Sequence, residues 1–210
     1  MKVRIAGAVV LATASLALGS VANAAAKKPA PPICKQLVDD ADDAYAGGSN
    51  NASRQPSSAT LDILSADIAT GKKNVVGAIR VRSLEKDTWT TGGSSYLLYW
   101  VSDGVKRSLA YRTYADAAPD AVFDADTASG QSSDLIPVAF SVDTAQAVIT
   151  FTMPRKLEPS LKKAGAAFTG LSVVSNLGVN MLGSYTMTGF DQASSPRKYV
   201  DGTLTCLKGA

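Results

Sequence analysis

Four carboxylates lie close together in the segment Val38-Asp-Asp-Ala-Asp-Asp-Ala-Tyr45, at Asp39, Asp40, Asp42 and Asp43. Adjacent carboxylates repel one another unless a cation or water screens them. Calcium takes about six to eight oxygen ligands in flexible geometry and accepts mixed carboxylate and carbonyl groups. The segment is therefore a candidate calcium site. The alternative is a solvated polar loop that continues through Gly47-Gly-Ser-Asn-Asn51, because runs of like charge are commonly solvated.

The first residues predict export. Lys2 and Arg4 precede an apolar run from Ile5 to Leu18, and small residues ending in Ala22-Asn-Ala24 follow. This is the layout of a secretory signal peptide, and the run is shorter than the roughly 20 residues of a membrane-spanning helix. We expect residues 1–24 to be the signal peptide, 25–32 a flexible lead-in, and 33–210 a single secreted domain without membrane insertion. Removing Lys2 and Arg4 lowers the formal net charge from +3 to +1, which gives no reason to expect nucleic acid.

The chain has two cysteines, Cys34 and Cys206, and no histidine. The cysteines lie near the two ends of the expected mature chain, and an exported protein meets oxidising surroundings. We expect Cys34 and Cys206 to form a disulfide; the alternative is two independent buried thiols. With both cysteines paired, thiol catalysis, histidine-based triads and the common His and Cys zinc sites lack their residues.

Enzyme motifs are scarce. The only glutamates are Glu85 and Glu158, whereas a glycosidase needs two carboxylates at a set spacing across a cleft. No nucleophile elbow, phosphate-cradling loop or dinucleotide fingerprint occurs. The acids of residues 116–126 fall between expected strands, where turns favour aspartate. We expect no catalysis; the alternatives are a secreted hydrolase or enzyme accessory that uses Asp carboxylates, and a protein-binding or inhibitor module.

Two tryptophans have different surroundings. Trp89 lies in Glu85-Lys-Asp-Thr-Trp-Thr-Thr-Gly-Gly93, which is typical of a loop. A loop tryptophan needs a ligand or a packing partner, so Trp89 is a candidate to stack on a sugar or to pack over the end of the fold. Trp100 shares a strand face with Tyr96 and Leu98 and is expected in the core. A second aromatic residue for a sugar site stays open among Tyr111, Tyr114, Tyr185 and Tyr199.

Short strands must position these residues. One strand is expected to begin at 61–63, and further strands are expected at 74–84, 95–102, 107–113, 135–142, 147–151, 168–175, 184–190 and 203–206. Asp103-Gly104 is a strong hairpin signal, and apolar residues alternate along 135–142. Pro154 to Gly165 is the one expected helical turn. About nine or ten short strands without βαβ alternation predict an all-β, antiparallel β-sandwich.

Four features follow one another along the chain: the acidic N-terminal loop, Leu61-Asp-Ile-Leu-Ser-Ala-Asp67, Gly71-Lys-Lys-Asn-Val-Val-Gly-Ala-Ile-Arg-Val81, and Asp191 with Tyr199-Val-Asp-Gly202. This layout resembles the DOMON-like β-sandwiches related to family 9 carbohydrate-binding modules, especially an uncharacterised group of secreted bacterial proteins. The resemblance covers most of the expected mature chain. The family pattern Asp-x-x-Gly-Asp contains a glycine that the acidic loop of this chain lacks.

The resemblance implies a structural calcium ion between the acidic loop and a nearby strand. Asp62, at the start of a strand, and Asp191 are the expected further ligands, provided that the terminal disulfide brings their segments to the loop. Glycan or cell-envelope material is the ligand class that the resemblance implies. We therefore expect an exported, non-catalytic binding module with a calcium site.

Overall fold

The computed structural model describes residues 34, 36–46, 58–85, 93–126, 135–181 and 184–202. The expected signal peptide, the lead-in, Trp89, Cys206 and the expected strand at 203–206 lie outside the described residues. Within the described ranges, no helix combines the length and the hydropathy needed to span a membrane.

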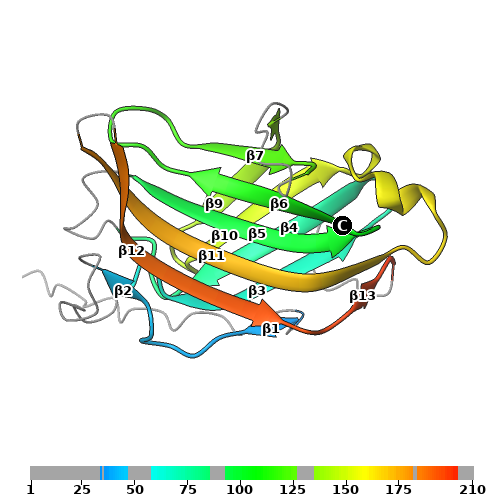
Figure 1. The fold of residues 1–210 in the computed structure, drawn as a ribbon, viewed down its shortest axis with the longest axis horizontal. Helices are drawn as coiled ribbons and strands as arrows, with labels where there is room; N and C mark the ends of the chain where they lie inside the picture. The colour runs from blue at the N-terminus through cyan, green and yellow to red at the C-terminus, as the bar shows by residue number, and fades with distance from the viewer. Residues whose placement is uncertain are drawn as a thin grey trace, which may run out of the picture.

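Two antiparallel sheets face each other as a β-sandwich (Figure 1), which confirms the fold class predicted from the sequence. Sheet A has the strand order β1-β3-β4-β10-β9, and sheet B has the order β2-β12-β11-β5-β6-β7-β8, with β13 paired to β11. The strands of sheet A are β1 (Leu37–Val38), β3 (Ile63–Thr70), β4 (Asn74–Val81), β9 (Ala139–Asp143) and β10 (Val148–Pro154). The remaining strands are β2 (Tyr45–Ala46), β5 (Ser94–Ser102), β6 (Val105–Arg112), β7 (Asp120–Asp124), β8 (Ile136–Pro137), β11 (Ala167–Met181), β12 (Ser184–Ser195) and β13 (Tyr199–Val200).

The core between the sheets follows from alternation along the strands. On β5, Tyr96, Leu98 and Trp100 point inward and are at most 3% exposed. The core position predicted for Trp100 is therefore confirmed. Its ring lies against Phe123 and Phe168, with centroid distances of 6.0 and 5.7 Å.

The predicted hairpin at Asp103-Gly104 is also confirmed. Ser102 pairs with Val105 across the turn, so the loop has two residues. Asp103 has φ 49° and Gly104 has φ 76°. Positive φ at both central residues is the type I′ geometry, which matches the right-handed twist of the flanking strands.

One predicted strand is divided between the sheets. Residues 135–142 were expected to be continuous, but β8 belongs to sheet B and β9 to sheet A. Between them, the Val138 N–H donates to the Ala121 carbonyl of β7 at 3.0 Å. The chain thus passes directly from the edge of one sheet to the edge of the other.

Strand β7 was not predicted. Its acidic ends, Asp120 and Asp124, were interpreted as turn residues, but both belong to the strand and flank its buried residues Ala121–Phe123. At one end, Asp120 pairs with Arg112 of the neighbouring strand, which offsets the low strand preference of aspartate.

The predicted helical turn at 154–165 consists of two 3-10 turns, Arg155–Leu157 and Pro159–Lys162. Glu158 between them is a buried carboxylate that accepts hydrogen bonds from Trp100 Nε1 at 3.0 Å, Ser102 Oγ at 3.1 Å and Ser160 Oγ at 2.8 Å. Arg107 Nε lies 3.0 Å from the same carboxylate, and the two charged side chains are 7% and 0% exposed. The network holds both turns against sheet B.

We expect Glu158→Gln to lower the free energy of unfolding by about 3 to 5 kcal/mol, because it leaves the Arg107 charge buried without a counterion. Chemical denaturation followed by tryptophan fluorescence measures the change. Exposed Glu85→Gln is the control, with an expected change within about 0.5 kcal/mol. A loss below about 1 kcal/mol for Glu158→Gln would show that water reaches this pair.

Candidate functional site

Residues 36–46 form an N-terminal bridge between the sheets, along the side of the sandwich where β1 and β2 lie (Figure 1). Strand β1 pairs with β3 of sheet A, and β2 pairs with β12 of sheet B. Between the two strands, the Asp39 N–H donates to the Leu64 carbonyl at 3.2 Å. These contacts place the acidic loop beside the start of β3 and beside β12.

Three carboxylates meet there, from Asp39, Asp43 and Asp191. One oxygen of each lies within 4.8 Å of the others. Asp191 on β12 is 5% exposed and accepts the backbone N–H groups of Ile63 and Gln192, both at 2.7 Å. The Oδ2 atom of Asp39 is buried and has no hydrogen-bond partner within the described structure. A buried oxygen without a partner, beside two further acids, is a position where a cation or a proton is favourable.

The other predicted ligands are arranged differently. Asp62 is fully buried and accepts the Asp42 N–H at 3.0 Å, while its carboxylate lies 3.0 Å from Arg82 Nε. Asp42 also pairs with Arg82. Asp40 is exposed and is not part of the group of three. Of the six predicted acids, Asp39, Asp43 and Asp191 thus lie close together, and Asp42 and Asp62 pair with Arg82. Asp40 belongs to neither group.

Arg82 was not predicted from the sequence. It follows the last residue of β4, Val81, and its guanidinium pairs with Asp42 and Asp62 near the start of β3. The sequence does show an arginine at the end of a β-branched run that follows an acidic loop. Which acids this arginine pairs with depends on the register between strands, which the sequence does not show.

Electrostatic conditions in this region favour protons or cations. Burial raises the pKa of Asp39 and Asp62 from 3.8 to about 6, and repulsion by Asp191 and Asp43 adds to the effect. Burial also raises the pKa of Asp191, although the Ile63 N–H acts against it. The carboxylates are therefore harder to ionise here than in water.

The donor set of Asp39, Asp43 and Asp191 fits calcium. Two oxygens that bind one calcium ion at about 2.3 to 2.6 Å can be no more than about 5 Å apart. The three oxygens, within 4.8 Å of one another, meet this limit. Three carboxylates offer up to six oxygens, and carbonyl groups or water complete a calcium shell.

A second feature is the end cavity, of about 650 Å³, at one end of the sandwich. It is lined by Thr60, Leu84, Glu85, Gly93, Ser94, Tyr96, Tyr111, Thr113, Tyr114, Ala115, Ala117, Pro119, Val142 and Thr144. The rings of Tyr96 and Tyr111 are stacked at 6.1 Å, and Tyr96 donates its hydroxyl to the Thr60 carbonyl at 2.9 Å. Tyr111 is 6% exposed, and its hydroxyl makes no hydrogen bond with the described residues. Burial raises the pKa of that hydroxyl.

Tyr114 presents a more open ring to the end cavity and is 42% exposed. Its hydroxyl lies 3.2 Å from Asp120 Oδ2, and the Arg112 guanidinium lies 6.0 Å from the ring centroid. Arg112 also donates two hydrogen bonds to Asp120, at 2.8 and 2.6 Å, which hold the pKa of Asp120 below its usual range. These contacts hold the ring in place, and the side chain stays partly exposed.

Two predicted residues can be judged only through their neighbours. Trp89 lies outside the described residues, but the nearest described residues on either side, Glu85 and Gly93, both line the end cavity. Cys34 is disulfide-bonded, and the described residues contain no free cysteine. Its predicted partner, Cys206, lies outside the described residues, so the pairing stays a prediction.

The chain matches no protein-family model, and neither curated proteins nor solved structures give a match. The acidic group and the end cavity are therefore the features of this chain that bear on its function.

The raised pKa values predict how stability depends on pH. A carboxyl group with a raised pKa binds its proton more readily in the folded chain, so its ionisation lowers stability as pH rises from about 4 to about 6. Without divalent cations, we expect Asp43→Asn to be more stable than the parent protein above pH 6, because one source of repulsion is gone. The advantage should disappear near pH 4.

Urea denaturation in a chelating buffer at both pH values measures this difference. Asp124→Asn is the control, because Asp124, on β7, does not contribute to the raised pKa values of Asp39 and Asp62. An Asp43→Asn variant that is no more stable than the parent protein at pH 7.5 would contradict the proposed repulsion.

Proposed function

We propose that this protein is an exported, non-catalytic binding module that holds a sugar residue of a glycan in the end cavity and a structural calcium ion at Asp39, Asp43 and Asp191. The observation that carries the proposal is the lining of the end cavity. There, the exposed ring of Tyr114 and the Tyr111 hydroxyl, which makes no hydrogen bond with the residues that the structure describes, border the same space.

A sugar ring has apolar C–H faces and a rim of hydroxyl groups, so its site needs flat apolar surfaces and a few hydrogen-bonding groups. The Tyr114 ring supplies a flat surface that is already held in place by Arg112 and Asp120. A surface that is ordered before binding loses less conformational entropy when the ligand arrives.

The hydrogen-bonding groups and the charge of the cavity lining support the proposal of an uncharged ligand. Tyr111 contributes a hydroxyl, and serine and threonine residues contribute others. Glu85 is the one charged residue among the described residues of the lining, so this part of the lining contains no cation for an anionic ligand. Trp89, which lies outside the described residues, remains the residue predicted from the sequence to stack on a sugar.

In this proposal, calcium has a structural role and takes no part in binding the sugar. Asp39 and Asp43 belong to the N-terminal bridge, and Asp191 belongs to β12 of sheet B. An ion shared by these residues would join the bridge to β12 and relieve the repulsion that, after burial, raises the pKa values of Asp39 and Asp191. Asp62 and Arg82 support the site from outside, since they fix the backbone N–H of Asp42.

Tyr111→Phe tests the sugar site. We expect it to leave the free energy of unfolding unchanged, because the hydroxyl has no hydrogen bond to lose among the described residues, and to weaken sugar binding about three- to tenfold, as for the loss of one hydrogen bond. Isothermal titration calorimetry with a panel of soluble mono- and oligosaccharides measures the affinity.

The matched control is Tyr96→Phe, which removes a hydroxyl bonded to Thr60 and should lower stability by about 1 kcal/mol. If no saccharide of the panel binds, or if Tyr111→Phe binds as well as the parent protein, the sugar site is wrong.

Thermal unfolding with calcium and with a chelator tests the metal site. A ligand of the folded state at about 100 times its Kd stabilises by about 2.7 kcal/mol, so calcium should raise the Tm clearly. Asp43→Asn should remove most of this rise.

Asp40→Asn is the matched control, because Asp40 is a neighbouring acid outside the group of three, and it should retain the calcium-dependent rise. An equal loss in both variants would point to screening by the whole loop, and no rise in the parent protein would leave the acids as a solvated loop.

A further inference from the structure

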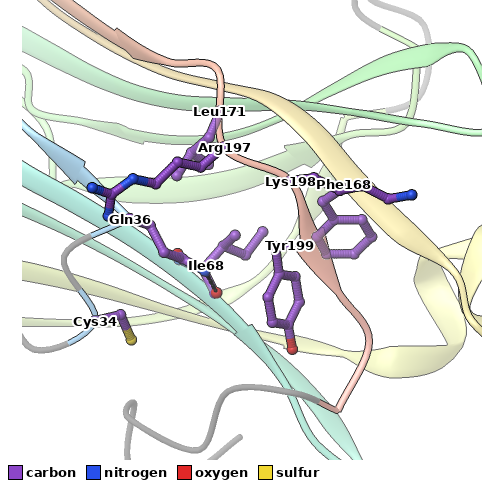
Figure 2. Close-up of a pocket in the computed structure, with 8 residues that line it drawn as sticks. All are labelled: Cys34, Gln36, Ile68, Phe168, Leu171, Arg197, Lys198 and Tyr199. Atoms are coloured by element: carbon purple, nitrogen blue, oxygen red, sulfur yellow. Dashed lines mark hydrogen bonds between the residues drawn. The ribbon is translucent and has the colours of Figure 1, made fainter.

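A cavity of about 430 Å³ lies beside the turn that joins β3 to β4 and beside the two 3-10 turns that follow β10 (Figure 1). We call it the lysine cavity, because Lys72, Lys73, Lys156 and Lys162 line it. Lys73 directly precedes β4, whereas Leu84 of the end cavity follows that strand, so the two cavities lie at opposite ends of β4. The described lining shares no residue with the end cavity or with a smaller cavity of about 220 Å³ between β3 and the β11–β13 side of sheet B (Figure 2).

The four lysines carry positive charge that the described part of the chain does not neutralise. All four are exposed, and none of them forms an ion pair with a described residue. The neighbouring Lys163 differs, because its ammonium group lies 2.7 Å from Asp103. Like charges around one cavity repel one another, and an anion that they share relieves this repulsion.

The other charged residues of the described lining, Arg155 and Glu158, have counterions within the fold. Arg155 pairs with Asp201 at 2.5 Å. Glu158 is 1% exposed and pairs with Arg107 at 3.0 Å. These two pairs compensate each other's charges locally, so the net charge of the lining is that of the four lysines.

The three turns that carry the lysines are fixed to one another through Arg155. Its backbone N–H donates to the Lys73 carbonyl at 2.8 Å. Its guanidinium donates to the carbonyl groups of Gly71 and Leu161, both at 3.1 Å. The β3–β4 turn is itself closed by the Gly71 N–H, which donates to the Asn74 carbonyl at 2.8 Å. The backbone of the cavity is therefore in place before a ligand arrives, and only the lysine side chains lose freedom on binding.

The lining indicates the class of ligand. Lysine ammonium groups are compact point charges that bind phosphate. The described lining contains no aromatic ring on which a nucleic-acid base could stack. It also contains none of the exposed large apolar side chains of the described residues, which could anchor the cavity in a membrane surface. A small multivalent anion fits these conditions better than either macromolecular surface.

We propose that the lysine cavity binds a compact anion with two or more phosphate groups, which Lys72, Lys73, Lys156 and Lys162 share. Each ammonium group has three N–H donors, and each phosphate group offers several acceptor oxygens. A monovalent anion compensates only one of the four charges, so a multivalent anion is selected. The volume of about 430 Å³ lies within the range of about 300 to 1,000 Å³ that is usual for small-molecule sites. This site is independent of the proposed sugar and calcium sites.

Sodium tripolyphosphate is the probe, in a buffer without divalent cations, so that it cannot act by withdrawing calcium from the acidic group. Inorganic monophosphate at equal ionic strength is the comparison. We expect tripolyphosphate to raise the Tm of the full chain and to bind about tenfold more tightly than monophosphate in calorimetric titration. No binding of tripolyphosphate would overturn the proposal, and so would an equal effect of monophosphate, which would mean general screening of surface charge.

Two double variants with the same change in net charge locate the site. Replacement of both Lys73 and Lys162 by Gln should weaken tripolyphosphate about tenfold, because it removes two of the four cations. The matched control replaces Lys106, which lies over the Tyr99 ring, and Lys198, which lines the smaller cavity, by Gln. It should retain the parent affinity within about twofold. All four lysines are exposed, so both variants should fold.

An equal loss of affinity in both double variants would assign binding to the net charge of the chain and refute the site. Sedimentation with vesicles that contain phosphatidylglycerol separates the anion from a membrane surface. We expect no cosedimentation of the parent protein at physiological ionic strength. Vesicle binding that depends on Lys73 and Lys162, without binding of tripolyphosphate, would identify a membrane contact in place of the proposed ligand.

Discussion

The two sheets depend on chain segments that cross between them at both open sides. An edge strand leaves unpaired N–H and C=O groups, and a sandwich has such edges on each side. On one side the crossing is short, since Val138 alone separates β8 from β9. On the other side the N-terminal bridge covers the gap, held where Asp62 accepts the Asp42 N–H and Asp191 accepts the Ile63 N–H. Acids are collected at this crossing because carboxylates can accept backbone N–H groups that no strand pairs.

Some buried polar groups of the described residues have hydrogen-bond or ion-pair partners, and a few do not. Glu158 has several, including Arg107, and its position is explained by the fold alone. Asp39 Oδ2 and the Tyr111 hydroxyl are buried or nearly so without a hydrogen bond to the described residues. Most buried polar groups in folded proteins are paired, so these two oxygens are places where a ligand gains a contact. They coincide with the acidic group and the end cavity, which supports the proposed division between an ion site and a sugar site.

The cavity of about 220 Å³ between β3 and the β11–β13 side of sheet B also depends on the N-terminal bridge. The N-terminal bridge brings Gln36 to β3, where its amide bonds Ile68 in place of a neighbouring strand. A side chain in that position leaves space that a continuous strand would fill. The connection from β12 to β13 then brings Arg197 to the rim. The short strand β1 at the edge of sheet A is thus followed by the acidic loop and lies next to a small, largely apolar pocket.

Composition and local pattern by themselves determined the all-β class, the hairpin at Asp103-Gly104 and the core position of Trp100, because each depends on neighbours in sequence. They also identified the acidic loop as a candidate ion site, but not which of its acids lie together and which pair with an arginine. Only the tertiary structure decided that Asp191 joins Asp39 and Asp43 while Asp62 binds Arg82, because this depends on register between strands far apart in the chain. The burial of Glu158, the strand β7 between two acids and the open hydroxyl of Tyr111 were invisible for the same reason. Side-chain partners across sheets are set by packing, which no local spacing encodes.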